Sequence, residues 1–307
     1  MKAFTWDELG AQPALREDLP NPAPGAGEVL VRVQASSVNP VDNAIAAGML
    51  KDMVEHVFPV TLGRDFAGVV EEVGADVSGV SVGDEVLGFV PAMGPAVQAG
   101  TWAELIVVPE SIVTRKPGGV DTAVAGAAPL AAVTALTAID ALDVSGGDTV
   151  LVIGATGGVG SLAAQLAAAA GATVLAPGLP EDEEYLGGLG VDEVLPRDGD
   201  VVAAVRERHP DGVNAVLDLV SFTPGTYDAA LRDGGRVASP TNAAGEGPGR
   251  TNVMAAPTPE YLQRLAQLLG AGGLEVPIQQ TYELDRAGEA LQALAGHTQG
   301  KLALRVA

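Results

Sequence analysis

The chain has 307 residues, of which 47% are hydrophobic but only 4% aromatic, so we expect a core built mainly from Val, Leu and Ala. It contains no cysteine, which excludes disulfides and thiolate metal sites, and its three histidines are too scattered in the sequence to suggest a bound metal. A net charge of −22 argues against nucleic acid or an anionic membrane as a partner; it indicates solubility, with salt adaptation as the alternative. No signal peptide or membrane-spanning run is recognisable, so we expect a cytoplasmic protein.

The first third of the sequence is predicted to be rich in β-structure. Residues 28–34 alternate apolar and polar side chains with a period of two, which indicates a half-buried strand. Residues 66–70 and 85–90 are predicted to form further strands, and glycines punctuate the segments between them. Short strands with turn signals indicate a compact, barrel-like β domain.

After residues 117–119 the pattern changes to alternating strands and helices. Asp121 is a candidate N-cap for a buried, Ala-rich helix over 123–138. Strands separated by helices of this length predict βαβ units and a doubly wound parallel sheet. The expected strands are 149–153, 172–176, 193–195, 214–219, 236–239 and an edge strand at 250–256, and the expected helices are 159–170, 200–208 and 227–231.

The last fifty residues do not continue this rhythm. Residues 260–269 place Leu262, Leu265 and Leu269 on one helical face, and 287–294 form a second predicted helix. Two strands are predicted, at 276–284 and 301–306, the latter with alternating side chains. We therefore predict one domain from residues 1–119 and 257–307, and a second, inserted domain over 120–256.

The most informative motif is the glycine turn at residues 154–160, which lies between a predicted strand and a predicted helix. Such a turn brings backbone N–H groups and a helix N-terminus up to a pyrophosphate. Gly157, Gly158 and Val159, preceded by Thr156, are expected to face that group, and Gly160 is expected to let the helix pack closely on the sheet. Ala155 stands where the usual motif begins with glycine.

Several short motifs, taken in order, resemble the zinc-free medium-chain dehydrogenase/reductases of the quinone oxidoreductase type. They are residues 38–42, 62–70, 82–86, 100–104, 108–109, 129–131, 134–135, 154–160 and 300–301.

The resemblance implies a GroES-like β-barrel catalytic domain, a Rossmann domain and an active site in the cleft between them. It also implies hydride transfer from NADPH to a quinone, an enal or an enone, and a homodimer paired through the edge strand at 250–256. Zinc-dependent relatives carry a cysteine where this chain has Asn39, and a histidine that is missing near Arg64.

The resemblance also proposes substrate-site residues. Asn39 is a candidate to polarise a substrate carbonyl and Asp42 to brace the loop, although both residues could serve only the turn. Thr134 is expected near the nicotinamide, unless its hydroxyl bonds its own helix. Lys301 is expected either to reach the cofactor or to lie at the surface of the last strand.

The remaining predicted cofactor contacts lie at the carboxyl ends of the predicted strands, where ligands bind in such sheets. Met254 is a candidate nicotinamide contact or an ordinary interface residue. The strand-end candidates are Leu219, Val220, Ser239, Pro240 and Thr241.

The second strand of the predicted Rossmann sheet bears on the choice of nucleotide. Gly178 stands where NAD-binding relatives have an aspartate, which favours NADPH. Yet the acidic run 181–184 follows, with no adjacent cation. Arg197, after the third strand, is the best candidate for a 2′-phosphate, although it could equally be a solvated loop arginine. NADPH is therefore favoured and NADH stays possible.

The positions of the tyrosines bear on whether the substrate is a quinone or an activated alkene. None lies in the first 184 residues, so the predicted catalytic domain offers few tyrosine proton donors for an alkene; His56 is a possible acid or a surface loop residue. A quinone can take its proton from water, so we rank quinone reduction above reduction of an enone or enal. A non-catalytic nucleotide-binding or scaffold protein is the alternative of another class.

Overall fold

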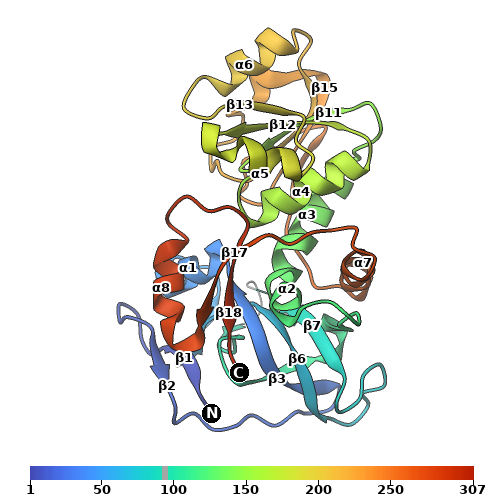
Figure 1. Ribbon diagram of the computed structural model, residues 1–307. Helices are drawn as coiled ribbons and strands as arrows, with labels where there is room; N and C mark the ends of the chain where they lie inside the picture. The colour runs from blue at the N-terminus through green and yellow to red at the C-terminus, as the bar shows by residue number, and fades with distance from the viewer. Residues whose placement is uncertain (92–95) are drawn as a thin grey trace. The chain divides into compact units, whose positions relative to one another are not determined.

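The computed structural model describes residues 1–91 and 96–307 (Figure 1). The chain divides into two compact units, Met1–Leu130 with Ala256–Ala307, and Ala131–Ala255. The first boundary falls at Leu130 and not at the predicted residue 119. The physical reason is helix α2 (Thr122–Ala127), which packs against strands β3 (Glu28–Val38) and β6 (Asp65–Val73) of the first unit.

The first unit is built on a mainly antiparallel sheet in which β3 is central. Its strand order is β10-β7-β6-β3-β18-β17, and β9 also pairs with β3. A three-stranded sheet with the order β2-β1-β5 and a pair, β4-β8, complete it. The strands not yet given are β1 (Ala3–Trp6), β2 (Ala14–Arg16), β4 (Glu55–His56), β5 (Val60–Thr61), β7 (Glu85–Phe89), β8 (Ala96–Val97), β9 (Leu105–Pro109), β10 (Val113–Arg115), β17 (Ile278–Glu283) and β18 (Lys301–Arg305).

The C-terminal segment belongs to this first unit because β18 pairs with β3. Its strand does not alternate as predicted, since residues 301–304 are all buried. The reason is that β18 lies between β3 and β17 and is also in contact with α2. Helices α1 (Pro40–Ala46), α7 (Pro259–Gly270) and α8 (Ala287–Ala293) complete the unit, and α7 buries its three predicted leucines.

The second unit contains the predicted doubly wound sheet. Its six strands are all parallel, in the order β13-β12-β11-β14-β15-β16. Helices α4 and α5 pack on β12, and α6 packs beside β13 (Figure 1). The elements are α3 (Pro129–Ala141), β11 (Thr149–Ile153), α4 (Gly158–Ala169), β12 (Thr173–Gly178), α5 (Glu183–Gly188), β13 (Glu193–Pro196), α6 (Val201–Arg208), β14 (Val213–Asp218), β15 (Leu231–Ser239) and β16 (Arg250–Asn252).

Three predicted elements of this region are wrong in extent or type. The Ala-rich helix is split in two, because Pro129 starts a new helix and cannot continue the previous one. The expected helix at 227–231 is a short 3₁₀ turn, since Leu231 already pairs with Val213 as the start of β15. The edge strand ends at Asn252 and not at residue 256.

Candidate functional site

The predicted glycine turn connects β11 to α4. Gly154 has φ +87°, a left-handed conformation that favours glycine. Gly160 is the third residue of α4, and a Cβ atom there would lie 2.1 Å from the Gly154 carbonyl oxygen. Glycine at this position therefore lets α4 start against the end of β11.

Gly157 has a different role because it is the N-cap of α4 and faces open space. A Cβ atom on it would meet only the Gly154 carbonyl oxygen, at 3.6 Å. The first N–H groups of α4, including those of Gly158 and Val159, have no partner within the helix, and the helix dipole favours an anion there. The turn thus fits the pyrophosphate of a dinucleotide.

The turn lies at the point where the strand order of the sheet reverses, between β11 and β14, which is where such sheets bind ligands. At the end of β14, the Asp218 carboxylate accepts the N–H groups of Val220 and Ser221 at 3.1 and 2.9 Å. The Ser221 carbonyl accepts a hydrogen bond from the Thr241 hydroxyl. The loops after β14 and β15 are therefore tied together beside the glycine turn.

The predicted residues on these loops lie where the sequence analysis placed them. Leu219 donates its N–H to Ile153 at 3.2 Å, so it extends the pairing with β11. The Ser239 hydroxyl lies 2.8 Å from the Thr241 hydroxyl and accepts the Thr241 N–H at 3.1 Å, which closes the turn through Pro240. These contacts place the segment at the ligand-binding edge of the sheet; contact with a cofactor stays a prediction.

Packing at the end of β12 explains why this chain has glycine at position 178, where NAD-binding relatives have an aspartate that binds the ribose. A Cβ atom on Gly178 would lie 2.7 Å from Leu186 Cδ1 and 3.0 Å from Val194 Cγ1. Neither an aspartate nor an alanine fits without movement of these side chains. The neighbouring Arg197 is exposed and donates its backbone N–H to the Gly178 carbonyl at 3.2 Å.

One residue near the turn escaped the sequence analysis. Tyr185, on α5, donates its hydroxyl to the Thr156 carbonyl at 3.4 Å, so α5 contacts the glycine turn directly. Its signal in the sequence is weak, because a tyrosine within an acidic helix start resembles any amphipathic surface residue.

Two predicted nicotinamide contacts differ in exposure. Thr134 lies on α3 and is 7% exposed. Met254 lies two residues beyond β16 and not on it, and it is 69% exposed. The strand ends early because pairing with β15 stops at Asn252.

A second group of chemically important residues lies in the first unit, where Asp65 is the centre of a buried polar cluster. Its Oδ2 accepts hydrogen bonds from the Ser37 hydroxyl at 2.6 Å and from Asn39 Nδ2 at 2.8 Å. Its Oδ1 accepts the Leu130 N–H at 2.6 Å, at the start of α3. Lys301 Nζ lies 3.7 Å from Oδ2. One carboxylate thus joins β3, β6, β18 and Leu130 within the first unit.

Asn39 is the N-cap of α1, and Asp42 is the third residue of that helix. Asn39 donates from Nδ2 to both Asp65 and Ser37, and its Oδ1 accepts from Lys301 at 2.6 Å. Its amide is therefore fully engaged within the chain. Asp42 accepts the Asn39 N–H on Oδ2 at 2.8 Å. These contacts support the bracing alternative for both residues, and a direct contact with substrate stays a prediction.

Arg64 is a buried cation for which the sequence predicted no role. It was named only because the histidine of zinc-dependent relatives is missing near it. Its Nη2 donates to the carbonyls of Thr61 and Ala99, both at 3.2 Å. Its Nε lies 3.9 Å from Asp42 Oδ1, and neither of these two buried atoms has a hydrogen-bond partner. Burial raises the pKa of Asp42 to about 7, although the Arg64 charge opposes this shift; burial also lowers the pKa of Arg64.

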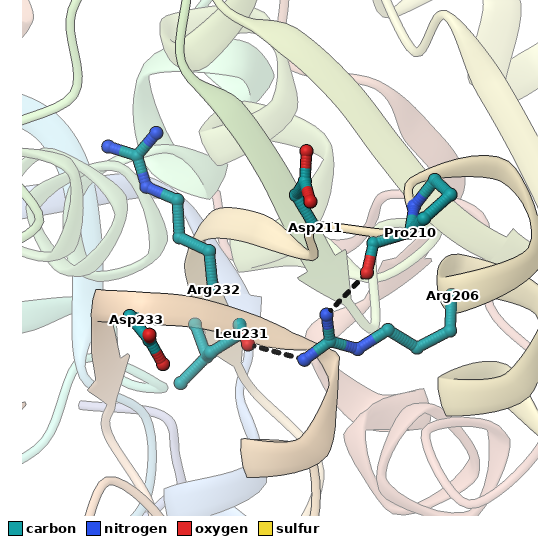
Figure 2. A pocket seen from close by; sticks show the side chains of 6 residues that line it. All are labelled: Arg206, Pro210, Asp211, Leu231, Arg232 and Asp233. Atoms are coloured by element: carbon teal, nitrogen blue, oxygen red, sulfur yellow. Dashed lines mark hydrogen bonds between the residues drawn. The ribbon is translucent and has the colours of Figure 1, made fainter.

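A surface hollow of the second unit lies at the other end of the sheet from the glycine turn. Figure 2 shows that Arg206 crosses it and donates to the carbonyls of Pro210 and Leu231, at 2.9 and 2.7 Å. Asp211, Arg232 and Asp233 complete its lining. Because Leu231 begins β15, the hollow lies at the amino ends of the strands and is separate from the predicted nucleotide site.

A doubly wound parallel sheet with a glycine turn at its switch point defines the class of dinucleotide-binding proteins. The alcohol dehydrogenase GroES-like domain family matches residues 25–118, and the zinc-binding dehydrogenase family matches residues 189–304. The chain belongs to the medium-chain dehydrogenase/reductase family, within the quinone oxidoreductase type, and is an oxidoreductase.

Three similar proteins cover nearly the whole chain. A chloroplast envelope quinone oxidoreductase homolog of Arabidopsis thaliana is 31% identical, covering 98% of this chain and 97% of the relative. A 2-methylene-furan-3-one reductase of Solanum lycopersicum is 32% identical, covering 99% and 79%. The structure of the quinone oxidoreductase from Coxiella burnetii has a TM-score of 0.86 at 28% identity, covering 100% and 99%. They confirm the predicted family and the GroES-like and Rossmann fold.

The described part of the chain also bears on the predictions about a metal ion and a membrane. Within residues 1–91 and 96–307, no group of three or more His, Cys, Asp or Glu side chains is arranged to hold a metal ion. No helix in that same part of the chain is long and apolar enough to cross a membrane.

Proposed function

We propose that this protein is an NAD(P)H-dependent reductase that transfers a hydride from the nicotinamide to a quinone without a metal ion. The observation that carries the proposal is the glycine turn at the switch point of the parallel sheet, with open space at Gly157 and a helix N-terminus behind it. When bound, a reduced nicotinamide supplies the hydride; the protein supplies binding and orientation. The names of the Arabidopsis and Coxiella proteins support the quinone.

Independence from metal is supported by the donor atoms of the chain. The sequence has no cysteine, and the Asn39 amide and Arg64 guanidinium donate hydrogen bonds to oxygens of the chain itself. Nitrogen–hydrogen donors cannot also ligate a cation. Dialysis against a chelator is therefore expected to leave activity unchanged, and loss of activity that added zinc restores would contradict this part of the proposal.

Quinone is ranked above an activated alkene for a specific reason. Reduction of an enone leaves a carbanion-like carbon that must be protonated, whereas a hydroquinone anion takes its proton from water. No tyrosine lies in the first 184 residues, so the predicted catalytic domain offers few tyrosine proton donors for such a carbon. The tomato relative, a 2-methylene-furan-3-one reductase, keeps the enone as the second candidate.

The decisive experiment follows loss of nicotinamide absorbance with NADPH or NADH, against a benzoquinone, a naphthoquinone and an enone. We expect turnover with the quinones to exceed turnover with the enone. Brisk turnover of the enone alone would reverse the ranking. A thermal shift with the nucleotide but no turnover of any acceptor would indicate a nucleotide-binding protein without this activity.

NADPH is the proposed nucleotide, with Arg197 as the partner of its 2′-phosphate. Arg197 is exposed beside Gly178, which replaces the aspartate of NAD-binding relatives. The nearby Asp182 is buried, and its carboxylate accepts the Leu179 N–H at 2.9 Å. Arg197→Ala is expected to raise KM for NADPH about tenfold and to leave KM for NADH unchanged, since about 1.4 kcal/mol corresponds to a factor of ten. Arg232→Ala, an exposed arginine at the other end of the same sheet, is the control. Equal effects on both nucleotides would refute this assignment.

We further propose that the protein is cytoplasmic. We also propose that it forms a homodimer through β16, an edge strand of the parallel sheet. An edge strand carries unpaired backbone groups that a second copy can pair with. Light scattering is expected to give the mass of a dimer, and Thr251→Pro is expected to shift the protein toward monomers.

A further inference from the structure

The ammonium of Lys301 is enclosed by oxygen atoms of its own unit. Lys301 begins β18 and is only 3% exposed. Its Nζ lies 2.6 Å from Asn39 Oδ1, 3.4 Å from the Val38 carbonyl oxygen and 3.7 Å from Asp65 Oδ2. The ammonium therefore does not lie at the surface of the last strand, the alternative that the sequence left open.

The charges of this cluster balance. Asp42 and Asp65 are both fully buried, as are Arg64 and, nearly so, Lys301. Burial of a charge is costly unless an opposite charge and hydrogen bonds compensate it. Burial lowers the pKa of Lys301, while Asp65 and Asp42 raise it. With all four groups ionised, the two carboxylates and two cations carry no formal net charge.

The ammonium also sets the orientation of a neighbouring side chain. Because Asn39 Oδ1 accepts from Lys301, Asn39 Nδ2 is turned toward Asp65 and Ser37. A flipped amide would place an NH₂ group against the ammonium, which has only donors to offer. Lys301 therefore fixes the turn that precedes α1.

We propose that the Val38 carbonyl, Asn39 Oδ1 and Asp65 Oδ2 form a binding site for a primary ammonium, which the chain fills with its own Lys301. Lys301 is thereby a positioning residue for Asn39, the N-cap of α1, and its contact with a cofactor stays a prediction. The proposal does not rest on the proposed reductase activity, because its test measures stability.

The test is replacement of the lost side chain by a free amine. Lys301→Ala removes three methylene groups and the ammonium, which together equal n-propylammonium. We expect Lys301→Ala to lower Tm by about 5–15 °C, as expected for an unpaired buried carboxylate in a chain of this size. Propylammonium chloride should then raise the Tm of this variant by several degrees more than the same concentration of tetramethylammonium chloride, which cannot donate hydrogen bonds.

Two matched variants serve as controls. Arg305→Ala removes a cation from the exposed end of the same strand, where Arg305 pairs with Glu283 at 2.7 Å, and should show no difference between the two salts. Lys301→Met fills the space without a charge and should also show none. Equal responses of Lys301→Ala to the two salts would overturn the proposal, as would a difference between the two salts for Arg305→Ala as large as that for Lys301→Ala.

A double-mutant cycle decides the matter if Lys301→Ala does not fold. Lys301→Met and Asp65→Asn each leave one buried partner without its opposite charge, whereas the double variant removes both charges. We expect the double variant to lose less Tm than the sum of the two single losses. Additive losses would show that the two groups do not act as a pair and would contradict the proposed site.

Discussion

At the scale of single residues, the buried cluster of Asp42, Arg64, Asp65 and Lys301 contains ionisable groups whose contacts the sequence did not predict. Asp42 is the member with an oxygen that no donor satisfies, and burial raises its pKa from the ordinary 3.8 to about 7. The folded protein thus binds a proton at Asp42 more tightly than the unfolded chain does. Asp42 costs stability increasingly as the pH rises from about 4 to about 7, and this cost is constant above that range.

This pKa shift predicts a pH-dependent difference between the wild type and Asp42→Asn. An asparagine cannot ionise, while the loss of the Arg64 partner is the same at every pH because arginine stays charged. As the pH falls from 7 to 5, the free energy of unfolding of the wild type relative to the variant should therefore rise by part of the roughly 4 kcal/mol that the pKa shift corresponds to. The Tm of the wild type relative to the variant should rise with it. Thermal melts over this pH range measure it.

The exposed Asp76 provides the control. It has φ +67°, a conformation that asparagine also tolerates, so Asp76→Asn should follow the wild type at each pH. A constant difference in Tm between Asp42→Asn and the wild type across pH 5–7 would show that Asp42 does not titrate in this range.

At the scale of elements, the two glycines of the nucleotide turn are separable by what surrounds them. A Cβ atom at Gly160 would lie 2.1 Å from one backbone atom and 2.6 Å from Ala155 Cα, whereas one at Gly157 would meet nothing closer than 3.6 Å. One glycine serves the packing of α4 on the sheet, and the other leaves space for a ligand.

Substitution of these two glycines is therefore expected to have two different effects, one on stability and one on nucleotide binding. Gly160→Ala should lower Tm by several degrees, because backbone atoms must move to admit the methyl group. Gly157→Ala should keep Tm near the wild-type value but weaken NADPH binding at least tenfold, since its methyl group occupies the approach to the N–H groups of α4. Melting curves and nucleotide titration measure the two effects. Normal NADPH affinity of Gly157→Ala would place the pyrophosphate elsewhere.

The sequence predicted elements whose signal is local. Residues 149–153 form a strand and Gly158–Ala169 a helix because an apolar run, glycines and a helical pattern follow one another directly. It did not predict that β18 is buried on both faces, because that depends on β3, β17 and α2, which come from distant parts of the chain.

The same reason limits the prediction of the candidate site. The turn at Gly157 is contiguous and was found, but the Asp65 cluster joins residues from 37 to 301 and could not be assembled by spacing. Its signal in the sequence was a pair of charged residues, Arg64 and Asp65, directly before the apolar residues 66–70. Charges in such a place are seldom buried unless they are paired, so their presence indicates a partner elsewhere in the chain.

At the scale of the whole molecule, the dominant feature is the net charge of −22. Each unit must fold despite repulsion among its surface carboxylates, and many of the ion pairs on the surface involve exposed side chains that contribute little. Screening should therefore matter more to this chain than to a protein with balanced charge.

We expect Tm to rise when the salt concentration increases from roughly 0.1 M to roughly 1 M, because the screening length falls from about 10 Å to about 3 Å. Differential scanning calorimetry in sodium chloride and in tetramethylammonium chloride at equal ionic strength measures the effect. Similar increases in both salts would identify screening as the cause, since the two cations differ strongly in specific binding. A Tm that stays constant or falls would show that the acidic surface does not destabilise the fold, and that its role is solubility alone.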